Sequence, residues 1–449
     1  MMSCTFVVPP PPLNGVVRDY AGGLGFEAAS SYVLPPLDLL QLAAIAERVA
    51  DVALEDFSFG RQSCAEAADH LGRNLSGRTF VVQVSLPTLH HDVEFARMLR
   101  ARGARVLERV PYIAPQSIST VEPDDRDEWL IGECEEVLCD VLEGKHEPGT
   151  LRPDAPPPPR PVDLDSLPYP LRRLTRSLPY HFPRLGPCAT LLSSRGCPFP
   201  CRYYCPYPLA QGSRWRARSA ESVVNEIRQI VVDRLATRVL FRDAVFTLDE
   251  TRVQRICQGL RQMKLPVKFW CETRADLLDE DTVRELAAAG CVGVNIGVET
   301  GDERLRLERL KSGVTDELLI AVCERLRRHG IQVSLLMMVG WPTETRESLV
   351  RTGALIARLR PRSVGFVFPT AYPGTDFHRD VTAADPGTSF RLPTSGEEPH
   401  IVSHHLQPEE MIKARKLLID LADAASEEGR AAELEARQRA LLDWAAAPR

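Results

Sequence analysis

The stretch Cys197-Pro-Phe-Pro-Cys201-Arg-Tyr-Tyr-Cys205 decides how the rest of this chain is interpreted. It places three cysteines within nine residues, separated by prolines and aromatic residues, and no helical pattern flanks it. Such a loop can wrap around one compact centre, and thiolate ligands select zinc or an iron–sulfur cluster. The short apolar run Ala189–Ser193 comes just before it and predicts a β-strand.

Two other interpretations of these cysteines stay open. A structural zinc site needs a fourth Cys or His nearby, and the nearest candidates in the sequence are His181, Cys188 and Cys257. Buried cysteines without a ligand, or a disulfide pair, are the structural alternative. Three thiolates with no obvious fourth ligand favour a cluster with one open iron, which is a catalytic arrangement.

The loop resembles that of the radical S-adenosylmethionine (SAM) superfamily, where three cysteines hold a [4Fe–4S] cluster and SAM chelates the fourth iron. The family spacing is C-x3-C-x2-C with an aromatic residue before the last cysteine. Here the spacing is C-x3-C-x3-C, one residue longer, which leaves the path of the loop open. The resemblance implies that Cys197, Cys201 and Cys205 are the cluster ligands and catalytic residues, and that Tyr203 or Tyr204 packs near SAM.

Composition limits the class of protein. A chain of 449 residues exceeds one ordinary core, so two or three domains are expected. The net charge of −6 gives a nucleic-acid partner no electrostatic support, and no apolar run is long enough to cross a membrane. The first residues lack a basic region before their apolar ones, so no signal peptide is expected. Twelve scattered cysteines then fit a reducing, cytoplasmic location.

Residues 1–150 alternate short apolar runs with helical patterns, which predicts an α/β domain with a doubly wound parallel sheet. The expected strands are Cys4–Val8, Val52–Leu54, Phe80–Val84, Arg105–Val110 and Trp129–Ile131. The expected helices are Leu37–Val49, Cys64–Leu75, Asp92–Arg102 and Glu135–Leu142. Four prolines follow the first strand in place of a G-x-G-x-x-G motif, so a dinucleotide site is disfavoured.

The loops of this domain resemble the Rossmann-like cobalamin-binding domain that precedes the radical SAM domain in a large class of that superfamily. The stretches that carry the resemblance are Gly22–Glu27, Tyr32–Leu40, Ser85–Thr88 and Gly132–Glu135. The resemblance implies cobalamin contacts from Pro10, Gly22, Gly23, Ser85, Leu86, Thr88, Gly132 and Glu133. The other B12 signature, D-x-H-x-x-G, is absent, so no histidine is expected below the cobalt. Ordinary turn chemistry is the alternative for these glycines and prolines.

Residues 151–185 are expected to be a Pro-rich linker, because residues 154–161 are mostly proline. Six βα repeats follow over residues 186–380 and suit a parallel barrel with its site at the carboxyl ends of the strands. The expected strands are Ala189–Ser193, Arg238–Arg242, Val267–Cys271, Val292–Val298, Gln332–Met338 and Ser363–Pro369. The expected helices are Ala220–Leu235, Asp249–Met263, Asp281–Ala289, Asp316–His329 and Thr345–Leu359.

The radical SAM resemblance implies that these repeats form a partial (β/α)6 barrel of the TIM type. It also implies SAM contacts at the strand ends, from Asp243, Glu272, Arg274, Glu299, Gly301 and Gly340. Arg274 suits the SAM carboxylate, because a planar guanidinium binds a carboxylate through two hydrogen bonds. For Glu272, Arg274 and Glu299, a structural ion-pair network at the barrel mouth is the alternative. Residues 381–449 are expected to form a small C-terminal helical cap, with one or two helices over Pro408–Trp444.

Together these features resemble a cobalamin-dependent radical SAM enzyme with a [4Fe–4S] cluster, SAM and methylcobalamin as cofactors. The activity that this implies is transfer of a methyl group from methylcobalamin and SAM to an unactivated carbon of a small specialised metabolite, through a 5′-deoxyadenosyl radical. Cyclisation, ring contraction or another rearrangement stays open, as does a non-catalytic cobalamin or Fe–S sensor. An electron donor such as flavodoxin or ferredoxin and a monomeric state are expected.

Overall fold

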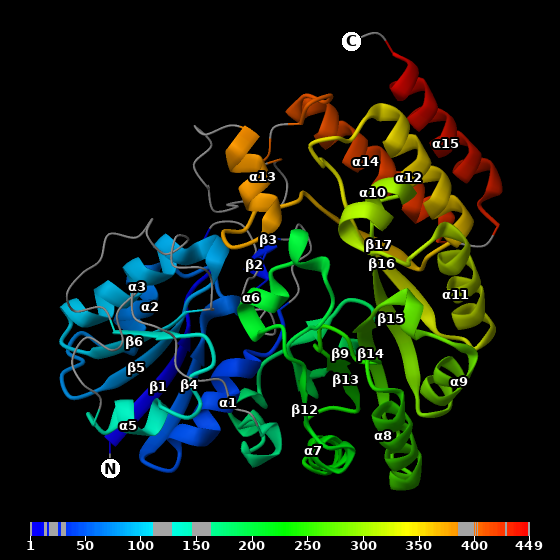
Figure 1. Cartoon of the computed structure of the whole chain (residues 1–449). Coiled ribbons are helices and arrows are strands. Elements are labelled where there is room, and N and C mark those ends of the chain that lie inside the picture. The colour runs from blue at the N-terminus through cyan, green and yellow to red at the C-terminus, as the bar shows by residue number, and fades with distance from the viewer. Residues whose placement is uncertain are drawn as a thin grey trace. The chain divides into compact units, whose positions relative to one another are not determined.

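The computed structural model describes residues 2–12, 16–17, 26–27, 33–110, 128–145, 163–384, 399, 401, 403–426 and 429–447. The predicted cobalamin residues Gly22 and Gly23 and the polyproline stretch lie outside these described residues. Within the described part the chain divides into two compact units. Unit 1 covers Met1–Pro198 and Pro206–Arg238, and unit 2 covers Phe199–Cys205, Val239–Arg391 and Gly396–Arg449. Both units are of the α/β type (Figure 1).

Unit 1 is built on a five-stranded parallel sheet in the order β4-β1-β5-β6-β7. Its strands are β1 (Met2–Val8), β4 (Ala50–Asp56), β5 (Thr79–Gln83), β6 (Arg105–Val110) and β7 (Glu128–Ile131). Its helices include α1 (Leu37–Ala46), α2 (Cys64–Leu71), α3 (Leu89–Ala101) and α5 (Leu138–Leu142). Every strand and helix that the sequence predicts for residues 1–150 is therefore confirmed, with ends that differ by a few residues.

Both faces of this sheet are buried. Phe6 and Val8 of β1 pack in one apolar cluster with residues of α1 and α5. Val7, between them, packs in a second cluster with residues of α2 and α3. Because successive side chains of a strand point to opposite faces, helices must cover both sides of the sheet, and this explains the continuous apolar runs at residues 6–8 in β1 and 80–82 in β5.

The described part of the predicted linker packs on unit 1. Leu167, Leu171 and Leu174 lie against the cluster that contains α1, and Leu171 N donates a hydrogen bond to Leu40 O at 2.9 Å. Residues 163–185 therefore belong to the packed body of unit 1, because their leucines bury apolar surface. The linker prediction missed this because it rested on the prolines of the preceding stretch.

Unit 2 contains five neighbouring strands in the order β13-β14-β15-β16-β17. They are β13 (Arg238–Phe241), β14 (Lys268–Thr273), β15 (Cys291–Glu299), β16 (Gln332–Met338) and β17 (Ser363–Val367). The helices α8 (Glu250–Met263), α9 (Glu280–Ala288), α11 (Asp316–Arg328) and α12 (Arg346–Leu359) lie along one side of them (Figure 1). Each of these helices begins after a side chain that caps its first turn, namely Asp249, Asp279, Thr315 and Thr345.

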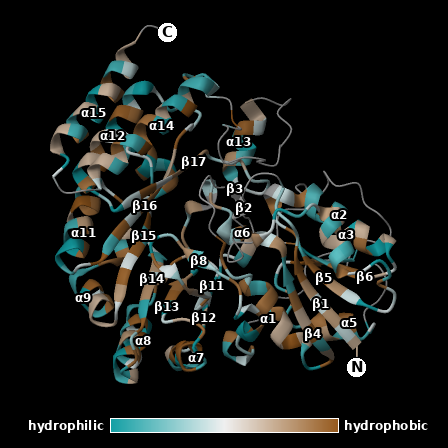
Figure 2. Cartoon of the chain, turned by 180° about the vertical axis from the view of Figure 1, so that it is seen from behind, coloured by the Kyte–Doolittle hydropathy of each residue, from teal (hydrophilic) through white to brown (hydrophobic). Residues whose placement is uncertain are grey.

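Two elements predicted with this barrel, β10 (Ala189–Leu191) and α7 (Ala220–Val232), belong to unit 1. The one or two helices predicted for the C-terminal tail are present as α14 (Pro408–Ala425) and α15 (Ala431–Ala446). They pack against each other and against α12. Apolar residues gather along the strands of both sheets, and polar residues are frequent on outer helices such as α8 (Figure 2). Within the described part of the chain, no helix combines the length and apolar character that a membrane span needs.

A close contact inside the second sheet gives a test of the fold. Gly293 of β15 lies opposite Trp270 of β14, and a Cβ at this glycine would stand 2.1 Å from the buried indole ring. We expect Gly293→Ala to destabilise the protein by about 1–3 kcal/mol, because the ring has no room to move. Gly365→Ala in β17, where the nearest atom would be 3.7 Å away, is the matched control. Equal thermal unfolding of the two variants would contradict this packing.

Candidate active site

Cys201 and Cys205 lie in unit 2 within a compact apolar and aromatic cluster. The other members near them include Phe199, Tyr203, Tyr204, Leu310, Trp341 and Phe377. Cys201 opens a short 3-10 turn, and its carbonyl oxygen accepts hydrogen bonds from Tyr204 N at 3.2 Å and Cys205 N at 3.0 Å. The longer spacing between these two cysteines is thus taken up as a tight turn, which brings Cys205 back towards Cys201.

Cys197 lies in unit 1, just after the two-residue strand β11 (Ser194–Arg195), and is 8% exposed. None of the twelve cysteines forms a disulfide bond, so the disulfide alternative for the loop is wrong. Among the residues that the structure describes, no group of three or more His, Cys, Asp or Glu side chains is placed to hold a single metal ion.

Glu299 connects the cysteine loop to the end of a strand. It is the last residue of β15 and adopts a left-handed backbone, φ +70°, at a register shift between β15 and β16. Its Oε1 accepts a hydrogen bond from the Tyr204 hydroxyl at 2.8 Å and lies 3.2 Å from Lys311 Nζ. All three side chains are largely buried, so the phenol and the ammonium together satisfy a carboxylate that water hardly reaches.

These contacts shift the acidities of the two partners. Burial raises the pKa of Tyr204 well above its usual value, and the neighbouring Glu299 adds to the rise. Burial alone would lower the pKa of Lys311, but the electrostatic interactions with Glu299 and then with Cys201 outweigh it, and the pKa is raised. At neutral pH the site therefore holds a neutral phenol and a charged ammonium.

Arg274 is the second cation beside the cysteines. Its Nη1 donates to Cys201 Sγ at 3.4 Å, and its guanidinium stacks 4.1 Å above the Phe199 ring. Its Nε and Nη2 donate to the two carboxylate oxygens of Asp276, at 2.9 Å each. A cation close to a thiol stabilises the thiolate form, which is the form that binds metal.

Other predicted SAM residues lie at the neighbouring strand ends. Asp243, after β13, is fully buried, and Glu272 of β14 forms an ion pair with Arg242 and accepts a hydrogen bond from Asn295 Nδ2 at 3.2 Å. Glu272, Arg274 and Glu299 each therefore have an ionic partner within the protein.

The two predicted glycines make close backbone contacts. Gly301 N donates to Thr352 Oγ1 at 3.0 Å, and a Cβ at this glycine would stand 2.2 Å from Thr352 Cα on α12. Gly340 has φ +103°, and its N–H donates to Glu344 Oε2 at 2.6 Å. It directly precedes Trp341, whose ring contacts that of Tyr204 edge-on at 5.7 Å.

Sequence reasoning missed Lys311, because no motif surrounds it. A signal was present in the composition: only six of the 55 basic residues are lysines. The other five lysines are exposed, whereas the Lys311 side chain is 11% exposed. The rarity of lysine in this sequence was the available hint.

The cobalamin residues predicted in unit 1 share one edge of its sheet. Pro10, the Ser85–Thr88 loop and Gly132 all follow the carboxyl ends of parallel strands, which end at the same edge. Asp92 Oδ2 accepts hydrogen bonds from Ser85 N at 3.0 Å and from Thr88 Oγ1 at 2.5 Å, and Leu86 is buried. A buried acid therefore holds this loop in a defined shape.

The remaining predicted residues at this edge are also held by local contacts. Pro10 O lies 3.0 Å from His91 Nε2, and Gly132, with φ +72°, donates from its N–H to Val110 O at 2.9 Å. Glu133 forms ion pairs with Arg195 and Arg216, at 2.7 and 2.6 Å. Neither arginine was singled out from the sequence.

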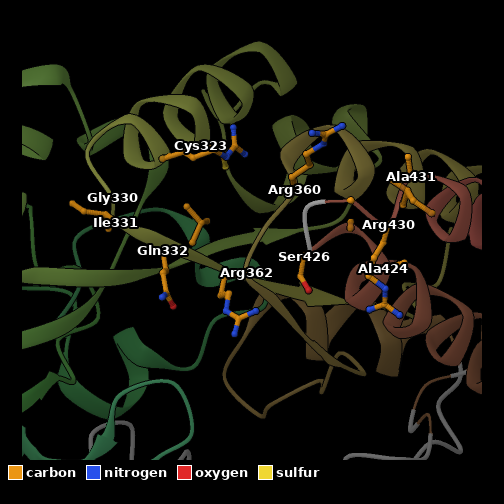
Figure 3. Close-up of a pocket in the computed structure, with 15 residues that line it drawn as sticks. Cys323, Gly330, Ile331, Gln332, Arg360, Arg362, Ala424, Ser426, Arg430 and Ala431 are labelled. Carbon is orange, nitrogen blue, oxygen red and sulfur yellow. The ribbon is translucent and has the colours of Figure 1, made fainter.

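A pocket of about 690 Å³ in unit 2 lies elsewhere (Figure 3). It opens at the amino ends of β16 and β17, whereas Glu299 and Gly340 follow carboxyl ends. Arg360 and Arg362 extend to opposite sides of it in Figure 3, and Arg327 Nη2 donates to Leu359 O at 2.9 Å, near the end of α12. These arginines suit the negative ends of helix dipoles. The pocket is not the candidate site, because it lies at the strand ends opposite to those that carry Glu299 and Gly340.

Residues 191–356 match the radical SAM superfamily. The chain contains a radical SAM domain. The matched range includes the cysteine loop, Arg274, Glu299 and Lys311, so the geometry described above belongs to this domain.

Three similar proteins extend the comparison. An uncharacterized methyltransferase of Pyrococcus horikoshii is 29% identical over 49% of this chain and 47% of its own length. The hopanoid C-3 methylase of Methylococcus capsulatus is 25% identical over 69% of this chain and 62% of its own length. The chain thus spans about half to three fifths of the length of these two relatives.

The third is a solved structure, the radical SAM methyltransferase TsrM of Kitasatospora setae with cobalamin and a [4Fe–4S] cluster bound. It has a TM-score of 0.64 at 18% identity and covers 86% of this chain and 75% of that one. The likeness shows the fold, and it reaches well beyond the radical SAM domain.

The contacts of Glu299 give a graded prediction for the metal-free protein. We expect Lys311→Met to destabilise it by about 3 kcal/mol or more, because removing one partner leaves a buried charge uncompensated. We expect Tyr204→Phe to cost only about 1–2 kcal/mol, because it removes a single hydrogen bond. Urea unfolding of both variants measures the difference, and a larger loss for Tyr204→Phe would contradict the ion pair.

Glu344 predicts a pH dependence. It is 2% exposed, and burial raises its pKa to about 8. The folded protein then keeps a proton that the unfolded chain loses above its ordinary carboxyl pKa, so this residue makes stability fall as pH rises towards 8. Glu344→Gln should raise the melting temperature by a few degrees at pH 8.5 and change it little at pH 5. Glu308→Gln, at an exposed carboxylate, is the control, and a gain at pH 5 equal to that at pH 8.5 would refute the assignment.

Proposed function

We propose that this protein is a cobalamin-dependent radical SAM methyltransferase that methylates an unactivated carbon of a small molecule. The observation that carries the proposal is the surroundings of the cysteine loop, where Arg274 and Lys311 place two cations near the buried sulfur of Cys201. These surroundings lie inside the radical SAM domain, and the fold likeness to a cobalamin-containing methyltransferase extends over most of the chain.

The cysteines suit a [4Fe–4S] cluster by their chemistry. Cys197, Cys201 and Cys205 would be its ligands, and each thiolate of such a cluster binds its own iron, so the three sulfurs need not converge on one point. Two neighbouring ligands are four residues apart, which limits their Cα separation to about 14 Å. The aromatic cluster around Cys201 and Cys205 would exclude water from the cluster.

SAM would bind on an ion-pair network that already exists. Glu299 and Lys311 offer a carboxylate and an ammonium to the charged groups of its methionine part. Arg274 is oriented by Asp276, which leaves its Nη1 edge directed to the cysteine. Asp243, Glu272, Gly301 and Gly340 stay proposed contacts, and Tyr203 or Tyr204 a proposed packing surface. In this proposal the residues that form ion pairs within the protein also bind SAM. The two interpretations are therefore compatible, because the same charged side chains take part in both.

Cobalamin would bind at the carboxyl edge of the sheet in unit 1, which we take to be a Rossmann-like domain in front of a partial (β/α)6 barrel. Pro10, Ser85, Leu86, Thr88, Gly132 and Glu133 are the proposed contacts at this edge, and Gly22 and Gly23 stay proposed contacts outside the described residues. When bound, the cluster and SAM supply a carbon-centred radical on the substrate, and the cobalamin supplies the methyl group. The protein's part is to orient these groups and to exclude water.

The reaction also needs an electron donor, for which a flavodoxin or ferredoxin is proposed. The reducing cytoplasm predicted from the cysteines would suit an oxygen-sensitive cluster.

The first test is anaerobic purification and cluster reconstitution, followed by iron, sulfide and cobalt analysis. We expect about four irons per chain and bound cobalamin. Cys205→Ala should lose most of the iron and keep the cobalamin, whereas Cys139→Ala, at a cysteine of similar exposure in unit 1, should keep both. Iron retained by Cys205→Ala, or zinc in place of iron, would refute the cluster assignment.

The second test is reaction of the reconstituted protein with isotopically labelled SAM under reducing conditions. Formation of 5′-deoxyadenosine together with labelled methyl in a product supports a methyltransferase. Formation of 5′-deoxyadenosine without methyl transfer would replace that activity with cyclisation or rearrangement. Cobalamin binding with no consumption of SAM would favour a sensor.

A further inference from the structure

The first cysteine of the loop follows a hairpin in unit 1. Strand β11 pairs antiparallel with β12 (Arg216–Ala217). Cys197 N donates to Gly212 O at 3.1 Å, which ties the cysteine backbone to the returning chain. Gly196, with φ +85°, packs so tightly against that chain that a Cβ would stand 2.2 Å from a backbone oxygen. The position of Cys197 therefore depends on how firmly the hairpin is closed.

A buried carboxylate closes this hairpin from outside. Glu133 follows β7, and both of its oxygens are bound by Arg216: Nη1 donates to Oε2 at 3.0 Å and Nη2 to Oε1 at 2.6 Å. Arg195 Nη1 lies 2.7 Å from Glu133 Oε2 and 2.7 Å from Glu135 Oε1. The side chains of Glu133, Glu135 and Arg216 are each less than 9% exposed.

The two arginines face each other across the hairpin, because Arg195 and Arg216 are direct partners in its register. One carboxylate thus holds both strands, and like charges that would repel each other are neutralised by it. The contacts continue towards the cysteine: Arg216 Nη2 donates to Gln211 O at 3.0 Å, and Gln211 Oε1 accepts from Gly196 N at 3.2 Å. This chain of bonds ends at the residue before Cys197.

We propose that Glu133 is a positioning residue for the first cluster ligand: its carboxylate holds β11 and β12 together and thereby fixes Cys197. Because β7 is part of the five-stranded sheet, the sheet is the support on which this part of the loop is built. The proposal rests on the proposed function in so far as Cys197 binds a cluster. The placement of Cys197 itself needs no cluster and can be measured without one.

The test uses the full-length, metal-free protein and measures the alkylation rate of each cysteine by peptide mass spectrometry. In Glu133→Gln we expect Cys197 to react about ten times faster than in the parent protein, because the hairpin opens more often. Cys257, fully buried in α8, is the internal reference and should not change. Glu128→Gln is the matched control, since Glu128 also binds an arginine, Arg105, through two bonds but at the other end of β7.

Reconstitution gives the second readout. Glu133→Gln should take up less than half of the iron of the parent protein, whereas Glu128→Gln should take up as much as the parent. An unchanged alkylation rate of Cys197 in folded Glu133→Gln would overturn the proposal, as would full iron uptake by that variant. If the parent protein takes up no iron, the proposed function fails, and the alkylation rates alone then decide the positioning role.

A second variant keeps the test decisive if Glu133→Gln does not fold. Arg216→Lys preserves the charge balance but cannot form the two-bond fork with the carboxylate. We expect it to fold and to expose Cys197 to a smaller degree, about threefold in rate. No change in that rate would count against the proposal in the same way.

Discussion

The ion pair between Glu299 and Lys311, completed by the Tyr204 hydroxyl, is the interaction on which the candidate site depends. It joins the cysteine loop, the end of β15 and the segment after β15 that carries Lys311. A buried carboxylate is tolerated only when its partners stay in place. The hydrogen bond to Glu299 therefore ties Tyr204, the residue before Cys205, to the end of β15. The left-handed backbone at Glu299 is the local strain that directs the carboxylate inwards.

Much of the fold could be predicted from the sequence, and the reasons are physical. Strands buried on both faces give short continuous apolar runs, as residues 80–82 of β5 do. The sequence also predicted β16 with the same first and last residues as in the structure, Gln332–Met338. Asp, Ser and Thr residues that cap a helix indicate in the sequence where the helix begins, as Thr345 does for α12. Strand ends also indicated where charged residues would gather, and Arg274 and Glu299 do lie near the cysteine loop.

What the sequence could not supply is the pairing of charges. Glu272, Arg274 and Glu299 stood out because each follows a strand, but only the folded chain brings Arg242, Asp276 and Lys311 to them. The same holds for the packing of residues 163–185, whose scattered leucines form no periodic pattern and yet bury against α1. Partners far apart in sequence leave no local signal, so their identity needs the tertiary structure.

The network of Glu133, Glu135, Arg195 and Arg216 has a consequence for protein engineering. It joins residues that precede and follow the Pro-rich stretch in sequence, which is where a designer would naturally divide the gene. The part before this stretch therefore cannot be exchanged on its own. A chimera that takes this part from one parent and the cysteine loop from another would bury two arginines or two carboxylates without partners. Grafts between such proteins should carry both halves of the network together, or move the junction beyond the hairpin.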